Sequence, residues 1–212
     1  MVTNKINEVI RIKQLKTTPK IIAVSKTFQI DKIIPLIKHG HIHFGENKIQ
    51  EAEDKWTNIK KENNALQLHM VGKLQSNKAK KAVKLFDFLH SLDSENLAKK
   101  ISIFSKELNK EIKVFIQVNI GDEIQKNGIS LNELDSFYNY CSNDLSLNII
   151  GLMCLPPINS DPEVFFKKLK KKSDILNLKD LSMGMSGDYE KAIINGSTYL
   201  RIGTEIFGKR NI

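Results

Sequence analysis

The stretch Ile21–Phe28, IIAVSKTF, contains four apolar residues in a row and, two positions later, a lysine. A short apolar run rich in β-branched residues and bounded by polar ones is typical of a strand buried on both faces. Lysine is among the side chains least often fully buried, so Lys26 at the end of such a strand needs an explanation. Either the strand ends there and the ammonium group reaches water, or Lys26 points into a site.

Apolar runs of the same kind recur along the whole chain and alternate with helix-length segments. In those segments apolar residues repeat every three or four positions, as in an amphipathic helix. Strands that are apolar throughout and alternate with helices indicate a parallel sheet covered by helices. The expected strands span residues 21–26, 41–46, 67–72, 86–92, 112–120, 147–155, 178–185 and 198–203.

Eight such strands are the number that closes a (β/α)8 TIM-type barrel. The chain of 212 residues is near the lower length limit of about 200 residues for this fold. A doubly wound open sheet is the competing architecture. We expect the α/β barrel, as one domain over residues 1–212. Ser94 is expected to cap one outer helix, and Asp161 followed by Pro162 to begin another.

The composition is that of a soluble globular protein, with 41% hydrophobic and 27% charged residues. The first residues, MVTNKINEVIRIKQLK, form an amphipathic pattern that predicts a first helix rather than a signal peptide. Cys141 and Cys154 form neither a CxxC motif nor a metal-spaced cluster, which fits a reducing cytoplasm. The net charge of +9 comes mostly from lysines spread along the expected helices, which indicates solvated faces.

Barrel geometry predicts where a site would lie, because active sites form at the C-terminal ends of the strands and phosphates often bind after strands 7 and 8. Both of these loops are rich in small residues. LSMGMSGD contains Ser186 and Gly187, and RIGTEIFG contains Gly203 and Thr204. Such loops offer backbone N–H groups and hydroxyls to an anion, and Ser186 is also expected to cap the next helix. No dinucleotide or NTP phosphate motif is present.

A phosphate site opposite a lysine at a strand end suggests a phosphorylated aldehyde as the ligand. Lysine amines form Schiff bases with carbonyl substrates and with pyridoxal 5′-phosphate (PLP). Lys26 is the candidate amine, because it follows the first strand of the expected barrel.

The ordered motifs AVSKT, FGEN, GKLQSNK, GLM, LSMGMSGD and RIGTEIFG resemble the pyridoxal phosphate homeostasis protein family, the YggS/PROSC-like proteins. These proteins are related in fold to the N-terminal barrel domain of alanine racemase. The resemblance runs from about Ile21 to Arg210. It implies that PLP is held as an internal aldimine on Lys26. It also implies a set of non-covalent contacts: Ser186, Gly203 and Thr204 to the phosphate, Asn47 near the ring, and Arg201 facing the pyridine nitrogen.

The resemblance implies a role in intracellular PLP homeostasis and not an enzyme. Arginine is always charged and only donates hydrogen bonds, so Arg201 disfavours a protonated pyridine nitrogen and weakens the ring as an electron sink. Racemase-like enzymes use a second acid/base, a tyrosine from an additional β-domain, and the tyrosines of this chain offer no obvious candidate. The alternative is a PLP-dependent amino-acid racemase with Lys26 as one base. The expected partners are PLP and PLP-dependent apo-enzymes, with no nucleic acid or membrane, and the chain is expected to be a monomer.

Two other patterns suggest different functions. HGHIHFGEN holds His39, His41 and His43 near Glu46, and two histidines on one face of a barrel strand can bind a metal, as in metal-dependent hydrolases. The later strand ends lack the further ligands that such a site needs. His69 is expected in the barrel interior or next to the PLP ring, and not as a metal ligand. The second pattern is a basic run without interleaved aromatics that could bind nucleic acid, formed by Lys73, Lys78, Lys80, Lys81 and Lys84.

Overall fold

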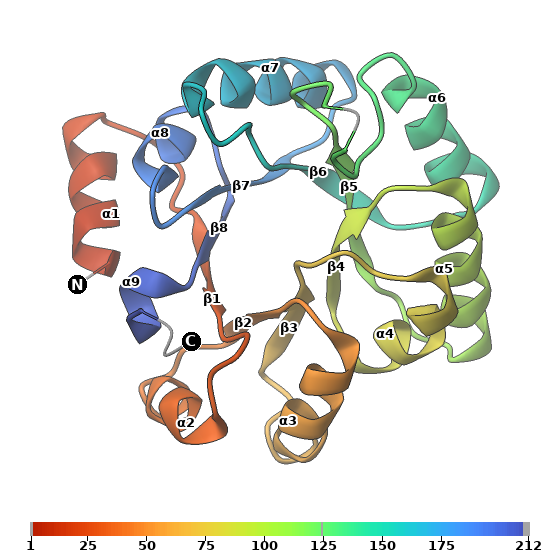
Figure 1. Ribbon diagram of the computed structural model, residues 1–212, viewed down its shortest axis with the longest axis horizontal. Helices are drawn as coiled ribbons and strands as arrows, with labels where there is room; N and C mark the ends of the chain where they lie inside the picture. Colours follow the sequence, from red (N-terminus) through yellow and green to blue (C-terminus); the bar gives the residue numbers. More distant parts are fainter. Residues whose placement is uncertain (1, 124, 210–212) are drawn as a thin grey trace.

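The computed structural model describes residues 2–123 and 125–209. Its eight strands are all parallel and form one closed barrel in chain order, with the last strand paired to the first (Figure 1). The predicted barrel is confirmed, and the open sheet is wrong. Residues 1, 124 and 210–212 of the predicted domain, including Arg210 at the end of the resemblance, lie outside the described residues.

Each predicted apolar run coincides with one strand, whose ends differ from the prediction by at most two residues; β1 begins one residue before its run. The strands are shorter than the apolar runs because the runs continue into the loops beside the barrel. The strands are β1 (Lys20–Val24), β2 (His43–Glu46), β3 (Gln67–Met70), β4 (Phe88–Leu92), β5 (Lys113–Val118), β6 (Ile149–Cys154), β7 (Asp180–Met185) and β8 (Tyr199–Ile202).

The helices lie around the outside of the barrel (Figure 1). The α-helices are α1 (Val2–Ile12), α2 (Ile30–Lys38), α3 (Ile49–Glu62), α4 (Ala79–Leu85), α5 (Glu95–Glu107), α6 (Leu134–Asn139), α7 (Pro162–Ile175), α8 (Tyr189–Ile194) and α9 (Thr204–Phe207). A 3₁₀ turn, η1 (Ser76–Lys78), precedes α4, and a π-helical segment, η2 (Tyr140–Asp144), follows α6. In the part of the chain that the structure describes, no helix combines the length and apolarity needed to cross a membrane.

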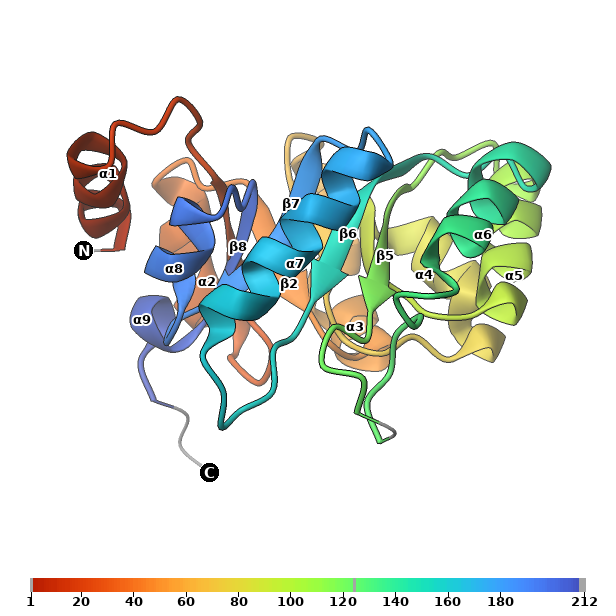
Figure 2. The ribbon, with the colours of Figure 1, turned by 90° about the horizontal axis from the view of Figure 1, so that it is seen from above.

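The helix starts predicted at Ser94 and at Asp161 are confirmed. The Ser94 hydroxyl accepts the N–H of Leu97 at 3.4 Å, and the Asp161 carboxylate accepts the N–H of Glu163 at 3.1 Å. The expected first helix is α1, which packs outside α8 (Figures 1 and 2).

Aromatic and imidazole rings fill the barrel interior. The ring of His69 stacks on Phe88 with 4.2 Å between centroids, and His90 stacks on Phe115 at 4.3 Å. The Tyr199 ring packs edge-on against Phe115. His69 is fully buried, so its predicted interior position is confirmed. The interior is therefore a packed core and not a pore.

The parallel strands place all their C-terminal ends on one face of the barrel. Figure 2 shows the loops that follow β5 and β6 projecting from this face. The first strand of the barrel ends at Val24, so Lys26 lies on the same face. A site built from these loops is the one that barrel geometry predicts.

The interior histidines are held neutral. Burial lowers the pKa of His69 and of His90 well below the usual value for histidine. The neighbouring His90 ring lowers the pKa of His69 further, and the charge of Arg201 lowers the pKa of His90 further. Burial and the charge of Lys20 lower the pKa of the half-buried His43 to about 4. These imidazoles therefore gain a proton more readily in the unfolded chain than in the folded one.

We expect the free energy of unfolding to fall as the pH is lowered from 7 to 5. The unfolded histidines bind protons near pH 6.5 while His69 and His90 in the barrel stay neutral, so each removes up to about 1.4 kcal/mol per pH unit below that value. Urea unfolding at pH 7, 6 and 5 measures this slope. His90→Gln should flatten it, whereas His39→Gln, at an exposed position, should not. An unchanged slope in His90→Gln contradicts the prediction.

Candidate functional site

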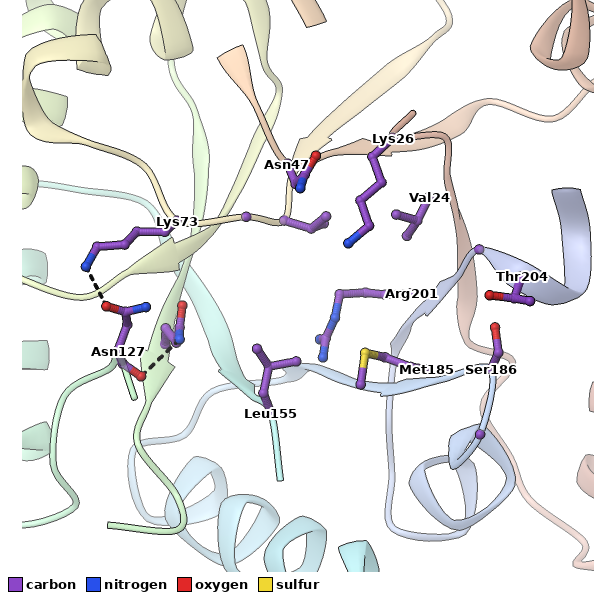
Figure 3. Close-up of a pocket in the computed structure, with 15 residues that line it drawn as sticks. Val24, Lys26, Asn47, Lys73, Asn127, Leu155, Met185, Ser186, Arg201 and Thr204 are labelled. Atoms are coloured by element: carbon purple, nitrogen blue, oxygen red, sulfur yellow. Dashed lines mark hydrogen bonds between the residues drawn. The ribbon is translucent and has the colours of Figure 1, made fainter. Parts of the chain in front are cut away.

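A cavity of about 420 Å³ opens at the C-terminal ends of the strands (Figure 3). Its walls come from the ends of β1, β2, β3, β5, β6, β7 and β8 and from the loops that follow them. The structure brings all the predicted cofactor residues together in this one cavity. They are Lys26, Asn47, Ser186, Arg201, Gly203 and Thr204.

Figure 3 shows how the polar groups are distributed around the cavity. The side chains of Lys26 and Arg201 extend into its centre, and Asn47 lies beside Lys26. The hydroxyls of Ser186 and Thr204 lie close together on one side. The cavity thus offers a primary amine, a guanidinium group and a pair of hydroxyls to one ligand.

Lys26 follows β1 by two residues, and the preceding residue is held in place from behind. The Ser25 hydroxyl donates to Glu46 Oε1 at 2.7 Å, and the Ser25 carbonyl accepts from Lys55 Nζ at 2.9 Å. Glu46 ends β2 and Lys55 lies on α3. The backbone before Lys26 is therefore fixed to the neighbouring strand and to the helix outside it.

The residue after Lys26 is fixed by the same helix. The Thr27 N–H donates to Glu51 Oε1 at 2.5 Å, and Lys55 Nζ donates to the same oxygen at 3.0 Å. Thr27 has a φ of +68°, which is unfavourable for a β-branched residue by about 1–3 kcal/mol. The contacts from α3 offset this cost and hold the turn in which Lys26 sits.

The Glu46–Lys55 pair is buried. The side chains are 0% and 8% exposed, and Lys55 Nζ lies 2.9 Å from Glu46 Oε1. Trp56 Nε1 donates to the same oxygen at 2.9 Å. A buried pair of this kind is costly to break, because removal of one partner leaves the other charge uncompensated. The buried pair therefore fixes the backbone at the end of β1, from which Lys26 extends into the cavity.

Arg201 is buried at the floor of the cavity, with 5% of the residue exposed. Nη1 donates to the carbonyl oxygen of Ser182 at 2.6 Å and to its hydroxyl at 2.7 Å, and Nη2 donates to the carbonyl oxygen of Cys154 at 2.9 Å. All three acceptors are neutral. Burial lowers the pKa of Arg201 from its usual value, yet a guanidinium group stays protonated at neutral pH. A positive charge therefore remains next to the cavity.

Asn47 carries a buried polar atom that has no partner within the protein. Its Oδ1 is buried and accepts no hydrogen bond from the described residues. Gly72 provides the space for Asn47, since a Cβ at position 72 would lie 2.5 Å from the Asn47 carbonyl oxygen and 2.7 Å from its Cβ. A buried acceptor of this kind in a cavity wall indicates a position for a ligand donor or a water molecule.

The loops after β7 and β8 form the hydroxyl side of the cavity, with Ser186, Gly187 and Thr204 in its wall. A Cβ at Gly187 would meet nothing within 4 Å, so the backbone there is open to a ligand. The expectation that Ser186 caps the next helix is wrong. Asp188 is the residue before α8, and its carboxylate accepts the N–H of Met185 at 2.6 Å. Ser186 therefore remains directed at the cavity (Figure 3).

The opposite wall contains two residues that sequence reasoning missed, Gln117 and Asn127. Gln117 Nε2 donates to the Asn127 carbonyl oxygen at 3.0 Å, and Lys73 Nζ donates to Asn127 Oδ1 at 2.5 Å (Figure 3). Gln117 is the one polar residue in the run VFIQV, which is a usable signal for a side chain directed at a site. Asn127 lies in a loop and carries no comparable signal.

The histidines considered as metal ligands bond to other groups. His41 lies before β2, and its Nε2 bonds to the His43 carbonyl oxygen at 2.9 Å. His43 Nδ1 bonds to His69 Nε2 at 3.0 Å. Glu46 is paired with Lys55 instead. Across residues 2–123 and 125–209, no group of three or more His, Cys, Asp or Glu residues is arranged to hold a metal ion.

Part of the basic run is compensated by acidic side chains. Lys80 pairs with Glu107, and Lys81 Nζ lies 2.6 Å from Glu53 Oε2. Lys73 belongs to the cavity wall. The run therefore does not act as one uniform cationic strip.

The chain matches known proteins along almost its whole length. Residues 6–211 match the family model of the alanine racemase N-terminal domain. The pyridoxal phosphate homeostasis protein of Pasteurella multocida (strain Pm70) is 35% identical over 209 residues, which cover 94% of this chain and 90% of that protein.

Solved structures show the same barrel. PipY of Synechococcus elongatus PCC7942 with PLP bound is 32% identical, with a TM-score of 0.82 and coverage of 96% of this chain and 100% of that chain. Without PLP, PipY gives a TM-score of 0.85. Alanine racemase from Corynebacterium glutamicum, at 16% identity and a TM-score of 0.69, shares the fold; the match covers 99% of this chain and 61% of that one.

We expect Lys55→Met to lower the free energy of unfolding by about 3–5 kcal/mol, because it leaves the Glu46 carboxylate buried without its counter-ion. Urea denaturation at pH 7 measures the change. Lys99→Met is the matched control, since Lys99 forms an exposed pair with Glu95 on α5 that contributes almost nothing. Equal stability of the two variants would show that the buried pair does not support the barrel.

Proposed function

This chain belongs to the pyridoxal phosphate homeostasis protein family, whose barrel is that of the alanine racemase N-terminal domain, and on this premise we propose that it binds PLP covalently through Lys26 and serves intracellular PLP homeostasis. The observation that carries the proposal is the convergence of an amine, a guanidinium group and two hydroxyls on one cavity.

The residues present fit PLP. The cavity of about 420 Å³ is within the usual range for small-molecule sites. Lys26 supplies the amine for a Schiff base with the aldehyde, and Ser186, Gly203 and Thr204 would hold the phosphate. The buried Asn47 Oδ1 supplies an acceptor beside Lys26 that the described residues leave unpaired. When bound, PLP supplies an electron-withdrawing ring and an electrophilic carbon.

Arg201 argues against aminotransferase chemistry and leaves proton transfer or carriage of the cofactor. Its guanidinium group offers only N–H donors and positive charge to the ring nitrogen, and both oppose protonation of that nitrogen. A neutral pyridine ring stabilises negative charge weakly. None of the four tyrosines, all of which lie in the described part of the chain, lines the cavity, so no tyrosine stands ready as a second acid/base. The proposal is therefore a PLP-binding protein without robust catalysis.

The proposal includes the setting in which the protein acts. Residues 1–212 are taken as one domain and a monomer. The two cysteines, Cys141 and Cys154, are free and buried, and burial raises the pKa of each thiol to about 12. Unreactive, unpaired thiols suit a reducing cytoplasm. PLP-dependent apo-enzymes are the proposed recipients of the cofactor.

We expect the purified protein incubated with PLP to show an absorption band that borohydride removes. Peptide mass mapping should then find one phosphopyridoxyl group, on Lys26. Lys26→Ala should lose both the band and the adduct, whereas Lys73→Ala, which removes the other lysine of the cavity wall, should keep them. Adducts spread over surface lysines in the wild type would contradict covalent binding at Lys26.

We expect little or no racemisation of amino acids by the PLP-loaded protein, because no tyrosine faces Lys26 across the described cavity. Chiral chromatography after incubation with L-alanine or L-serine measures the D-isomer. Turnover at ordinary enzyme rates, about 1 per second or faster, would establish the racemase alternative instead. Lys26→Ala provides the background rate.

A further inference from the structure

A continuous series of hydrogen bonds crosses the barrel interior and ends at Arg201. It begins at His43 Nδ1, which lies 3.0 Å from His69 Nε2, and continues from His69 Nδ1 to His90 Nε2 at 2.9 Å. His90 Nδ1 lies 2.8 Å from the Ser182 hydroxyl, which is 2.7 Å from Arg201 Nη1. The series starts on the neighbouring strands β2, β3 and β4 and reaches β7 and β8 (Figure 1).

The guanidinium group sets the direction of this series. Arg201 can only donate, so the Ser182 hydroxyl accepts from it and has its single hydrogen left to donate to His90 Nδ1. An accepting Nδ1 makes the neutral His90 carry its hydrogen on Nε2, and this hydrogen is donated to His69. The opposite direction would leave the Ser182 hydrogen without an acceptor among the hydrogen bonds of the described residues.

The same reasoning continues to the far end of the series. His69 accepts at Nδ1 and therefore donates from Nε2 to His43 Nδ1. His69 and His90 have both ring nitrogens engaged by protein groups. A second proton on any of these rings would remove an acceptor from the series, so the series requires neutral imidazoles. The direction thus follows from one charged donor and the number of hydrogens on each group.

The series fixes the orientation of Arg201. Three of the five N–H groups of an arginine are used here, by Ser182 Oγ and the carbonyl oxygens of Ser182 and Cys154. The remaining N–H groups, one on Nη2 and one on Nε, are left for a ligand in the cavity that Arg201 lines. Rotation of the guanidinium group would break bonds to two strands at once.

We propose that Ser182 and His90 are positioning residues for Arg201, joined to it by a hydrogen-bond chain that runs from the guanidinium group to His43. This hydrogen-bond chain holds the guanidinium plane so that its two remaining N–H groups, on Nη2 and Nε, face the aromatic ring of a bound ligand. The hydrogen-bond chain forms without a ligand. Only its effect on a bound ring rests on the proposed function.

The first test uses the full-length protein without PLP. Long-range ¹H–¹⁵N NMR of the imidazoles should find His43, His69 and His90 protonated at Nε2 and not at Nδ1. The Nη signals of Arg201 should be resolved, because rotation of a held guanidinium group is slow. A His90 protonated at Nδ1, or averaged Arg201 signals in the wild type, overturns the proposal.

The second test changes the link between His90 and Arg201. Ser182→Ala should average the Arg201 signals and weaken PLP binding by about tenfold, the loss expected for one hydrogen bond to a charged group. Ser182→Thr keeps the hydroxyl and should behave as the wild type. Ser173→Ala is the matched control, since Ser173 is equally buried and its hydroxyl donates to the Leu178 carbonyl oxygen, away from the cavity.

The outcomes separate this proposal from the proposed function. Resolved Arg201 signals in Ser182→Ala, or equal losses in Ser182→Ala and Ser182→Thr, overturn the positioning role, since packing and not the hydroxyl would then hold the guanidinium group. A wild-type protein that fails to bind PLP overturns the proposed function. In that case the imidazole and guanidinium signals still decide whether the chain positions Arg201.

Discussion

The pairing of the first strand with the last is the constraint on which the rest of the molecule depends. Ile22 of β1 pairs with Arg201 of β8, so the first and last strands lie side by side. Lys26 follows one of these strands and Thr204 the other. Because the strands are parallel, all their C-terminal ends lie on the same face of the barrel. Closure arranges these ends in a ring, so loops far apart in sequence surround one cavity. An open sheet of the same strands would separate the lysine from the hydroxyls.

Lys26 and Arg201, which extend into the centre of the cavity, both depend on polar networks behind them. Lys26 is supported outside the barrel by the buried pair of Glu46 and Lys55. Arg201 is supported inside the barrel by Ser182 and His90. Buried polar groups are expensive unless they are hydrogen-bonded, so each network persists only while its partners are all present. This arrangement orders the cavity before a ligand arrives and reduces the entropy lost on binding.

Much of the fold could be predicted from the sequence, and less of the site. The alternation of apolar runs and helices was sufficient to predict the barrel. The order of the motifs was sufficient to predict residues that line the cavity. Contacts between side chains that face each other across strands were beyond such reasoning. Glu46 looked like a possible metal ligand because histidines are near it in sequence, yet in space it meets Lys55. The hydroxyl of Ser186 predicts a helix cap, but Asp188 is the residue that directly precedes the helix. Period and composition predict which face a residue occupies, and only the tertiary structure determines its partner.

A shared barrel does not establish a shared activity, because function depends on the groups that line the site. The Corynebacterium glutamicum racemase contains this barrel within a longer chain, and the match covers 61% of it. What distinguishes a carrier from a catalyst is whether a second proton-transfer group lies opposite the lysine. Here the described wall opposite Lys26 holds neutral amides, Gln117 and Asn127, apolar Leu155, and Lys73, whose Nζ donates to Asn127 Oδ1. Amides can hold a ligand through hydrogen bonds but cannot exchange protons near neutral pH. The neutral amides, and the hydrogen bond that holds Lys73, support the carrier proposed above over a catalyst.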